Sequence, residues 1–147
     1  MNLPAIEIRI GNDLPADQLR ELYDSVGWKA YTTGPRGKDL PKAIRNSTYV
    51  VSAWSGGRLI GLARGLSDDV AILFLQDVLV HPDYQGQGIG RHLVESCLAR
   101  FAHVRSKVLL TDDQPGPLRF YESLGFKNTK QLKKMQINAF MLTEGVE

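Results

Sequence analysis

The sequence predicts a single α+β domain over residues 1–147, with a central, mostly antiparallel sheet that contains one parallel strand pair and is flanked by helices. Three strand-like stretches follow one another with short turns between them, at 48–54, 59–66 and 70–80, which is typical of antiparallel strands. A glycine-rich turn and an amphipathic helix then separate the third stretch from a fourth at 107–111. Because the chain must cross over to reach this fourth stretch, the last pair should be parallel. A chain of 147 residues can bury a core of its own.

The N-terminal part adds one strand and two helices. Isoleucines alternate with charged residues over 6–10, which predicts a half-buried strand. A helix should follow, with Asp13 as its N-cap and Gly27 just past its end. A second, short helix is expected over 40–45. The inner face of the first helix is formed by apolar side chains at helical spacing: Leu19, Leu22, Tyr23 and Val26.

The C-terminal part predicts a short helix and a hairpin. Pro117 suits a first helical turn and Gly125 suits the position after the last one, so a helix is expected over 117–124. The segment 126–142 should form a hairpin whose second strand is at 139–142. The lysines before that strand are typical of a solvated hairpin edge, where they block unwanted pairing.

Composition limits the classes of function. The net charge of +2 is too small to indicate nucleic-acid binding. No apolar run is long enough to span a membrane, and residues 1–10 lack a signal-peptide core, so a cytoplasmic or organelle-stromal location is expected. The lone cysteine, Cys97, excludes an internal disulfide and should be a buried helix residue. No cluster of histidine, cysteine and carboxylate residues has metal-binding spacing, so no metal is expected.

The most specific local feature is the glycine-rich turn between a strand and a helix. The run at 78–80 is strand-like, Pro82 ends it, and a helix opens at Ile89. A helix start after such a turn presents free backbone N–H groups and the positive end of the helix dipole, which together favour a phosphate. The residues expected to hold it are Gln85, Gly86, Gln87, Gly88, Ile89, Gly90 and Arg91.

Two nucleotide-binding motifs are excluded by the residues present. A P-loop requires a lysine after its glycines, and no lysine follows Gly88 or Gly90. A dinucleotide fingerprint that starts at Gly86 requires a glycine where Arg91 stands. The phosphate-bearing ligand is therefore of another kind.

Two motifs together resemble a known superfamily. The turn follows the pattern Gln-x-x-Gly-x-Gly from Gln85, and the stretch Phe-Tyr-Glu-Ser-Leu-Gly-Phe stands at 120–126. In this order and separation, within residues 48–127, they resemble the GCN5-related N-acetyltransferase (GNAT) superfamily. The resemblance implies that the turn binds the pyrophosphate of acetyl-CoA, and that backbone groups of the preceding strand contact its pantetheine arm and acetyl group. These strand residues are Val78, Leu79 and Val80.

Within the superfamily, residues 77–90 and the Leu-Ala-Arg run at 62–64 are most similar to plastid and cyanobacterial-type serotonin (arylalkylamine) N-acetyltransferases. The implied activity is direct acetyl transfer from acetyl-CoA to the primary amine of a small molecule, in a ternary complex. Acetylation of a protein or peptide, and non-catalytic acyl-CoA binding by a regulatory module, stay open. The expected partner is the small amine, without nucleic acid or membrane, and exposed terminal strands are compatible with a homodimer.

Amide formation from a thioester needs a proton donor for the leaving thiolate and a base for the amine. Tyr121 suits the first role, because a phenol with a pKa of about 10 stays protonated at pH 7, and the resemblance places it beside the sulfur. Three aspartates are candidates for the base. Asp112 comes first and Asp113 second, because both directly follow the strand at 107–111, and Asp77, which opens the run that lines the cofactor, comes third. Each of them could equally be a turn or cap residue. The resembled enzymes have one aspartate in a shorter segment before the tyrosine helix, so the base stays open.

Two aromatic residues, Trp28 and Tyr31, stand in the loop between the first two predicted helices. In the resembled family this loop walls the acceptor site, where aromatic side chains could hold an aryl group or a cation. On residue preferences alone, a lid over the hydrophobic core is an equal alternative.

Overall fold

The computed structural model describes residues 5–145 and contains two compact units, Met1–Leu110 and Thr111–Glu147. The first unit holds a five-stranded sheet and the helices that cover it. The expected α+β architecture, with a mixed sheet, is confirmed. Among the helices of the described range, none is long and apolar enough to cross a membrane.

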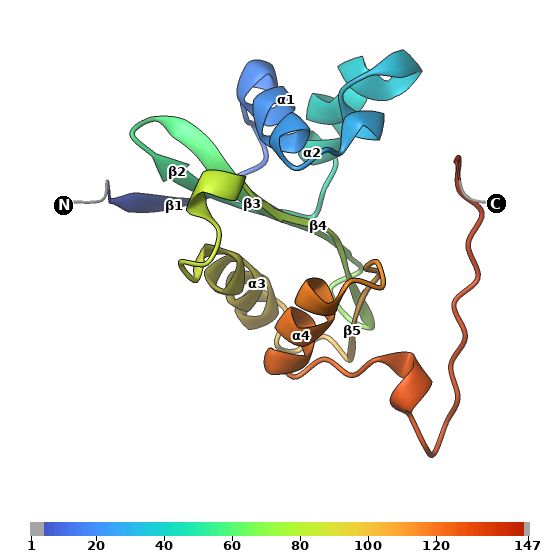
Figure 1. The fold of residues 1–147 in the computed structure, drawn as a ribbon. Coiled ribbons are helices and arrows are strands. Elements are labelled where there is room, and N and C mark those ends of the chain that lie inside the picture. The colour runs from blue at the N-terminus through green and yellow to red at the C-terminus, as the bar shows by residue number, and fades with distance from the viewer. Residues whose placement is uncertain (1–4, 146–147) are drawn as a thin grey trace. The chain divides into compact units, whose positions relative to one another are not determined.

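The strands lie in the sheet in the same order as in the chain, β1-β2-β3-β4-β5 (Figure 1). Neighbouring strands from β1 to β4 pair antiparallel, and β4 and β5 pair in parallel. The predicted parallel pair is thus confirmed, because a helix carries the chain from β4 across to β5. The bounds are β1 (Ile6–Ile10), β2 (Tyr49–Ser55), β3 (Arg58–Ser67), β4 (Ile72–Val80) and β5 (Ser106–Leu109).

Helices cover both faces of the sheet. Figure 1 shows α1 (Ala16–Ser25) and α2 (Leu40–Arg45) on one face and α3 (Ile89–Arg100) on the other. Two 3₁₀ turns, Lys29–Tyr31 and Gly34–Asp39, lie between α1 and α2.

The core on the α1 side forms where predicted. Leu19, Leu22 and Tyr23 are fully buried and pack with sheet residues such as Trp54 and Leu79. On the other face, α3 lies directly against β3: a Cβ added to Gly61 would be 3.2 Å from Leu93 Cδ1. Gly61 therefore leaves little room for a side chain between the strand and the helix.

The predicted N-cap of the first helix is wrong. Pro15, not Asp13, is the residue that precedes α1, and its backbone is extended at φ −60° and ψ 134°. No side chain caps this helix. Asp13 stands two residues too early for its carboxylate to serve the first N–H groups in the N-cap manner.

The second unit begins after β5 and holds α4 (Pro115–Ser123), which starts two residues earlier than predicted. Gly125 follows the helix with φ +94°, a left-handed conformation that favours glycine. A short 3₁₀ turn, Thr129–Gln131, comes next.

The predicted C-terminal hairpin is wrong, because no strand forms within the described residues 126–145. Phe140 is 94% exposed in the segment expected to be the second strand, and Met141 and Leu142 are exposed as well. A strand needs a ladder partner and a packed face. The apolar run at 139–142 has a suitable composition but neither of these two supports.

Candidate functional site

Strand β4 changes its pairing with β3 halfway along its length. Gly65 pairs with Leu75 and Arg64 pairs with Asp77, so Gln76 is an extra residue without a β3 partner. Such a bulge shifts the alternation of side chains by one position. Leu75 therefore shares one face of the sheet with Gly65, whereas Asp77 shares the opposite face with Arg64.

Strands β4 and β5 stop pairing before β4 ends. Their ladder closes with Leu75 opposite Leu109, so within the described residues β4 runs on to Val80 without a β5 partner. A parallel ladder normally satisfies the backbone groups between two strands. The last part of β4 therefore has backbone donors and acceptors on the β5 side that the sheet does not use.

The backbone groups on the β5 side of β4 can be assigned to individual residues. The N–H of His81 donates to the carbonyl oxygen of Ile60 on β3 at 2.8 Å. Backbone groups alternate in direction along an antiparallel ladder. The N–H and C=O groups of Val78 and Val80 consequently point away from β3, toward the side that β5 has left.

The glycine-rich turn follows directly from this end of β4. Gly86 and Gly88 have φ +79° and +82°, which favours glycine at both positions. A Cβ added at either glycine would meet no atom within 4 Å, so both backbones border open space. The Gln85 side chain donates to the Val80 carbonyl oxygen at 2.9 Å and ties the turn to the strand.

Helix α3 starts at the end of the turn. Its N-cap residue is Gly88, and no side chain caps the first N–H groups of the helix. Ile89 anchors this helix start in the core with 7% exposure, while Gly86 and Gln87 are exposed. In the first turn, Arg91 pairs with Glu95 at 2.9 Å. First-turn N–H groups and the positive end of the helix dipole thus face an open, glycine-lined turn, an arrangement suited to phosphate.

Asp77 lies in a buried network of hydrogen bonds. Its carboxylate accepts from Arg64 Nε at 2.6 Å, from the Tyr23 hydroxyl at 2.9 Å and from the Tyr31 hydroxyl at 3.2 Å. Asp77 is 4% exposed and Arg64 is 6% exposed. Burial, with the Asp77 charge beside it, raises the pKa of Tyr23 well above its usual range. A carboxylate with this set of partners favours a structural role for Asp77 over that of the base.

Trp28 and Tyr31 pack on the core cluster and are partly buried. Tyr31 lies edge-on to Tyr23 at 5.2 Å between ring centroids, and Trp28 lies edge-on to Tyr23 at 5.9 Å. The Tyr31 hydroxyl also accepts from the Gln76 side chain at 3.2 Å. The aromatic loop is thus attached to the bulge of β4. The same two side chains can cover the core and also form a wall beside this strand.

Tyr121 belongs to the second unit and lies on α4. Its ring packs edge-on against Phe120 and Phe126, with centroids 5.0 and 5.9 Å away. Burial raises the pKa of Tyr121 to about 12. The phenol therefore keeps its proton at neutral pH, as a proton donor must.

Asp112 and Asp113 also belong to the second unit, and both are exposed. The Asp112 carboxylate accepts from the backbone N–H of Gln114 at 3.2 Å, which is the local bond of an Asx turn. This bond occupies one carboxylate oxygen and leaves the other for a further contact.

Cys97 is fully buried on α3, as expected. Burial raises the pKa of its thiol to about 12. Because the thiolate is the nucleophilic form, this cysteine is unsuited to covalent catalysis.

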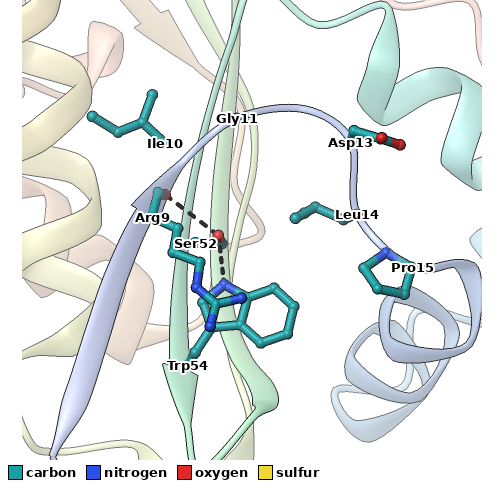
Figure 2. A pocket seen from close by; sticks show the side chains of 8 residues that line it. All are labelled: Arg9, Ile10, Gly11, Asp13, Leu14, Pro15, Ser52 and Trp54. Atoms are coloured by element: carbon teal, nitrogen blue, oxygen red, sulfur yellow. Dashed lines mark hydrogen bonds between the residues drawn. The ribbon is translucent and has the colours of Figure 1, made fainter.

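A hollow of about 370 Å³ lies elsewhere on the first unit, between the end of β1 and the start of α1 (Figure 2). There the Arg9 guanidinium lies 4.3 Å from the centroid of the Trp54 ring, and Trp54 Nε1 donates to Ser52 Oγ at 2.9 Å. The hollow opens where β1 ends, whereas the glycine turn follows the opposite end of the strands. No predicted site residue lines it.

Two features of this site have no local signal in the sequence. The bulge at Gln76 and the separation of β4 from β5 both arise from pairing between strands. Arg64 could have been suspected, since an arginine inside an apolar strand requires a buried partner. Nothing in the local pattern identified that partner as Asp77.

A model of the acetyltransferase (GNAT) family matches residues 16–126. The uncharacterized N-acetyltransferase ycf52 of Pyropia yezoensis is 29% identical over 113 residues, covering 74% of this chain and 63% of that protein. The histone acetyltransferase TAP1 of Glycine max is 35% identical over 130 residues, covering 80% and 54%. The chain thus spans only part of the length of these relatives. The solved structure of the GNAT-family acetyltransferase SP0256 of Streptococcus pneumoniae TIGR4 superposes with a TM-score of 0.77 at 28% identity, covering 95% of this chain and 99% of that one.

Proposed function

The chain belongs to the acetyltransferase (GNAT) family, and we propose that it is an acetyl-CoA-dependent N-acetyltransferase that acts on the primary amine of a small molecule. The observation that supports this most is the end of β4, where the backbone of Val78 and Val80 faces the side that β5 has left. A pantetheine arm carries amide groups that such a strand can pair with, in the manner of an added strand.

The glycine turn suits the pyrophosphate of acetyl-CoA. The open space over Gly86 and Gly88 allows a phosphate to approach the backbone, and the uncapped start of α3 supplies N–H groups. We assign the contacts to Gln85 through Arg91, with the strand residues Val78, Leu79 and Val80 beside the pantetheine and acetyl group. A diphosphate held at one end of β4 would direct the thioester along that strand.

The proposed reaction is direct attack in a ternary complex. The ammonium form of the substrate gives a proton to a base, and the neutral nitrogen attacks the acetyl carbonyl carbon. A C–N bond forms, the C–S bond breaks, and Tyr121 gives its proton to the sulfur. The proton released by the new amide nitrogen restores the phenol. A buried Cys97 thiol with a pKa of about 12 supports this route over one through an acetyl-cysteine.

Asp112 is our first assignment for the base and Asp113 the second, directly or through a water molecule. The partners of Asp77 argue for a different role for this third candidate. Through the Tyr31 hydroxyl, Asp77 would position the aromatic loop that we assign to the acceptor wall with Trp28.

The acceptor that we propose is an arylalkylamine, in keeping with the motif resemblance and with the two aromatic residues near the β4 bulge. A CoA-release assay should compare tryptamine and serotonin with polyamines, amino sugars and a lysine peptide. We expect turnover with the first two, and calorimetry should detect binding of acetyl-CoA without an amine. If calorimetry detects no binding of acetyl-CoA or CoA, the cofactor assignment is wrong and the site roles lose their basis.

Protein acetylation is the second candidate, because one relative at 35% identity bears the name histone acetyltransferase. Turnover of the lysine peptide, without turnover of any small amine, would favour it. Tight acetyl-CoA binding without turnover of any acceptor would instead favour a non-catalytic acyl-CoA-binding module.

A further inference from the structure

Within the described residues, the outer edge of β1 has backbone groups without a strand partner. Among the described strands, β1 pairs only with β2. Toward β2, the Gly11 N–H donates to the Val50 carbonyl oxygen at 3.0 Å, and the Arg9 carbonyl oxygen accepts from Ser52 Oγ at 3.4 Å. Because directions alternate along a strand, the backbone groups of Ile6, Ile8 and Ile10 point outward from the sheet.

Within the described residues, this edge lacks several of the usual protections against pairing, and its charges, Glu7 and Arg9, are of opposite sign. Natural edges are blocked by prolines, lysines and other charged side chains, bulges or very short strands. Residues 6–10 contain no proline or lysine, and their register with β2 is regular over all five positions. By contrast, β5 has four residues and carries Lys107.

The sequence of β1, Ile-Glu-Ile-Arg-Ile, is complementary to itself in the antiparallel direction. If two copies pair about a two-fold axis at Ile8, each outward backbone group of Ile6, Ile8 and Ile10 finds a partner. The same register places Glu7 of one copy opposite Arg9 of the other, twice. These are non-hydrogen-bonded positions, where opposite side chains are closest, about 4.5 Å between Cα atoms.

The charges on this face are already arranged for such a pairing. Within one copy, Arg9 Nε donates to the Glu7 carboxylate at 2.9 Å, and the Arg9 guanidinium lies over the Trp54 ring. In the paired form each charge would have an opposite charge beside it in its own strand and another across the strands. On the other face of β1, Ile10 is 68% exposed. In the paired form, the isoleucines on this face of one copy would pack together with those of the second copy.

We propose that β1 pairs antiparallel with β1 of a second copy of this chain, about a two-fold axis at Ile8, and joins the two sheets into one across a homodimer. Pairing along a five-residue edge buries less surface than a standard interface, which buries about 800 Å² per partner. The dissociation constant should therefore lie in the micromolar range, about 1–100 µM.

Sedimentation velocity of the full chain from about 1 to 200 µM tests the proposal, over the range where such a constant is resolved. The wild type should change from monomer to dimer. Glu7→Arg should weaken dimerisation by roughly tenfold or more, because both cross-strand pairs become arginine against arginine. Arg9→Glu should do the same with two glutamates.

Two matched combinations exclude a general loss of folding. An equimolar mixture of the Glu7→Arg and Arg9→Glu chains should form a heterodimer, since every arginine then faces a glutamate. The double variant Glu7→Arg/Arg9→Glu should regain the homodimer. A wild-type chain that stays monomeric at 200 µM overturns the proposal. So does a dimer that neither single variant weakens, or a mixture that stays monomeric while each chain has a native circular dichroism spectrum.

Discussion

At the scale of single residues, Tyr121 is the side chain whose removal tests the proposed chemistry most directly. Tyr121→Phe keeps the ring that packs against Phe120 and Phe126 and removes the proton donor. We expect kcat to fall about 100-fold or more, the size typical of general acid catalysis, with little change in KM for acetyl-CoA.

Because the pKa of Tyr121 is raised to about 12, the wild-type kcat should not decline as pH passes through 10. A CoA-release assay from pH 7 to 10.5 measures both.

The Arg64–Asp77 pair is the second residue-scale case, and it concerns stability. Both side chains are buried, and Nε and Oδ2 are 2.6 Å apart. Arg64→Ala or Asp77→Ala should lower the free energy of unfolding by about 3–5 kcal/mol, because each leaves an uncompensated buried charge. The double variant Arg64→Met/Asp77→Leu should lose less than either single one. Urea titration gives these values, and a single-variant loss below about 1 kcal/mol would contradict the structural role.

At the scale of elements, the glycine turn before α3 can be separated from ordinary turn strain. Gly88→Ala forces alanine into φ +82°, and Gly57→Ala does the same at φ +81° in the β2–β3 turn. Each should lower stability by about 1–2 kcal/mol. Only Gly88→Ala should also raise KM for acetyl-CoA, roughly tenfold, because its methyl group would enter the space assigned to phosphate. Equal KM changes in the two variants would remove the turn from the cofactor site.

The elements also show how far sequence patterns reach. The strands from β1 to β5 and the helices α1 to α4 lie within a few residues of the expected positions, because their apolar periodicity and their glycine and proline boundaries are local. The pattern fails at 126–142, where an apolar run has no ladder partner. It also fails at Asp13, because which residue directly precedes a helix is decided by backbone conformation.

At the scale of the whole molecule, the buried thiol and phenols predict how stability depends on pH. The pKa of Cys97 rises from 9.0 to about 12 and that of Tyr121 from 10.0 to about 12, both through burial. Burial, with the Asp77 charge second, also raises the pKa of Tyr23 and Tyr31. Above pH 9 the unfolded chain therefore binds fewer protons than the folded one, so each rise in pH favours unfolding.

The contribution of these groups is fully present below pH 9 and is lost as pH rises toward 12. Urea titrations at pH 8, 9, 10 and 11 should show a steady fall in the free energy of unfolding over about this range. Tyr121→Phe should give a shallower fall than the wild type. A stability that stays constant up to pH 11 would contradict the burial of these side chains.

Sequence patterns could indicate only those residues of the candidate site that are neighbours in the chain. Gln85 to Arg91 could be chosen because a strand, a glycine turn and a helix start are contiguous in sequence. The partners of Asp77 could not be chosen, because Tyr23, Tyr31 and Arg64 come from three other segments. Simple alternation along β4 places Leu75 and Asp77 on the same face, and the bulge at Gln76 places them on opposite faces.

The amino-acid sequence alone determined the strand and helix positions of this chain, its phosphate-suited turn and its family motifs. Each of these depends on neighbours within a few positions. The register between β3 and β4, the point at which β4 leaves β5, and the burial of Asp77 required the folded structure. These features depend on which segments meet across the sheet, and one inserted residue in a ladder changes the face of every side chain that follows it.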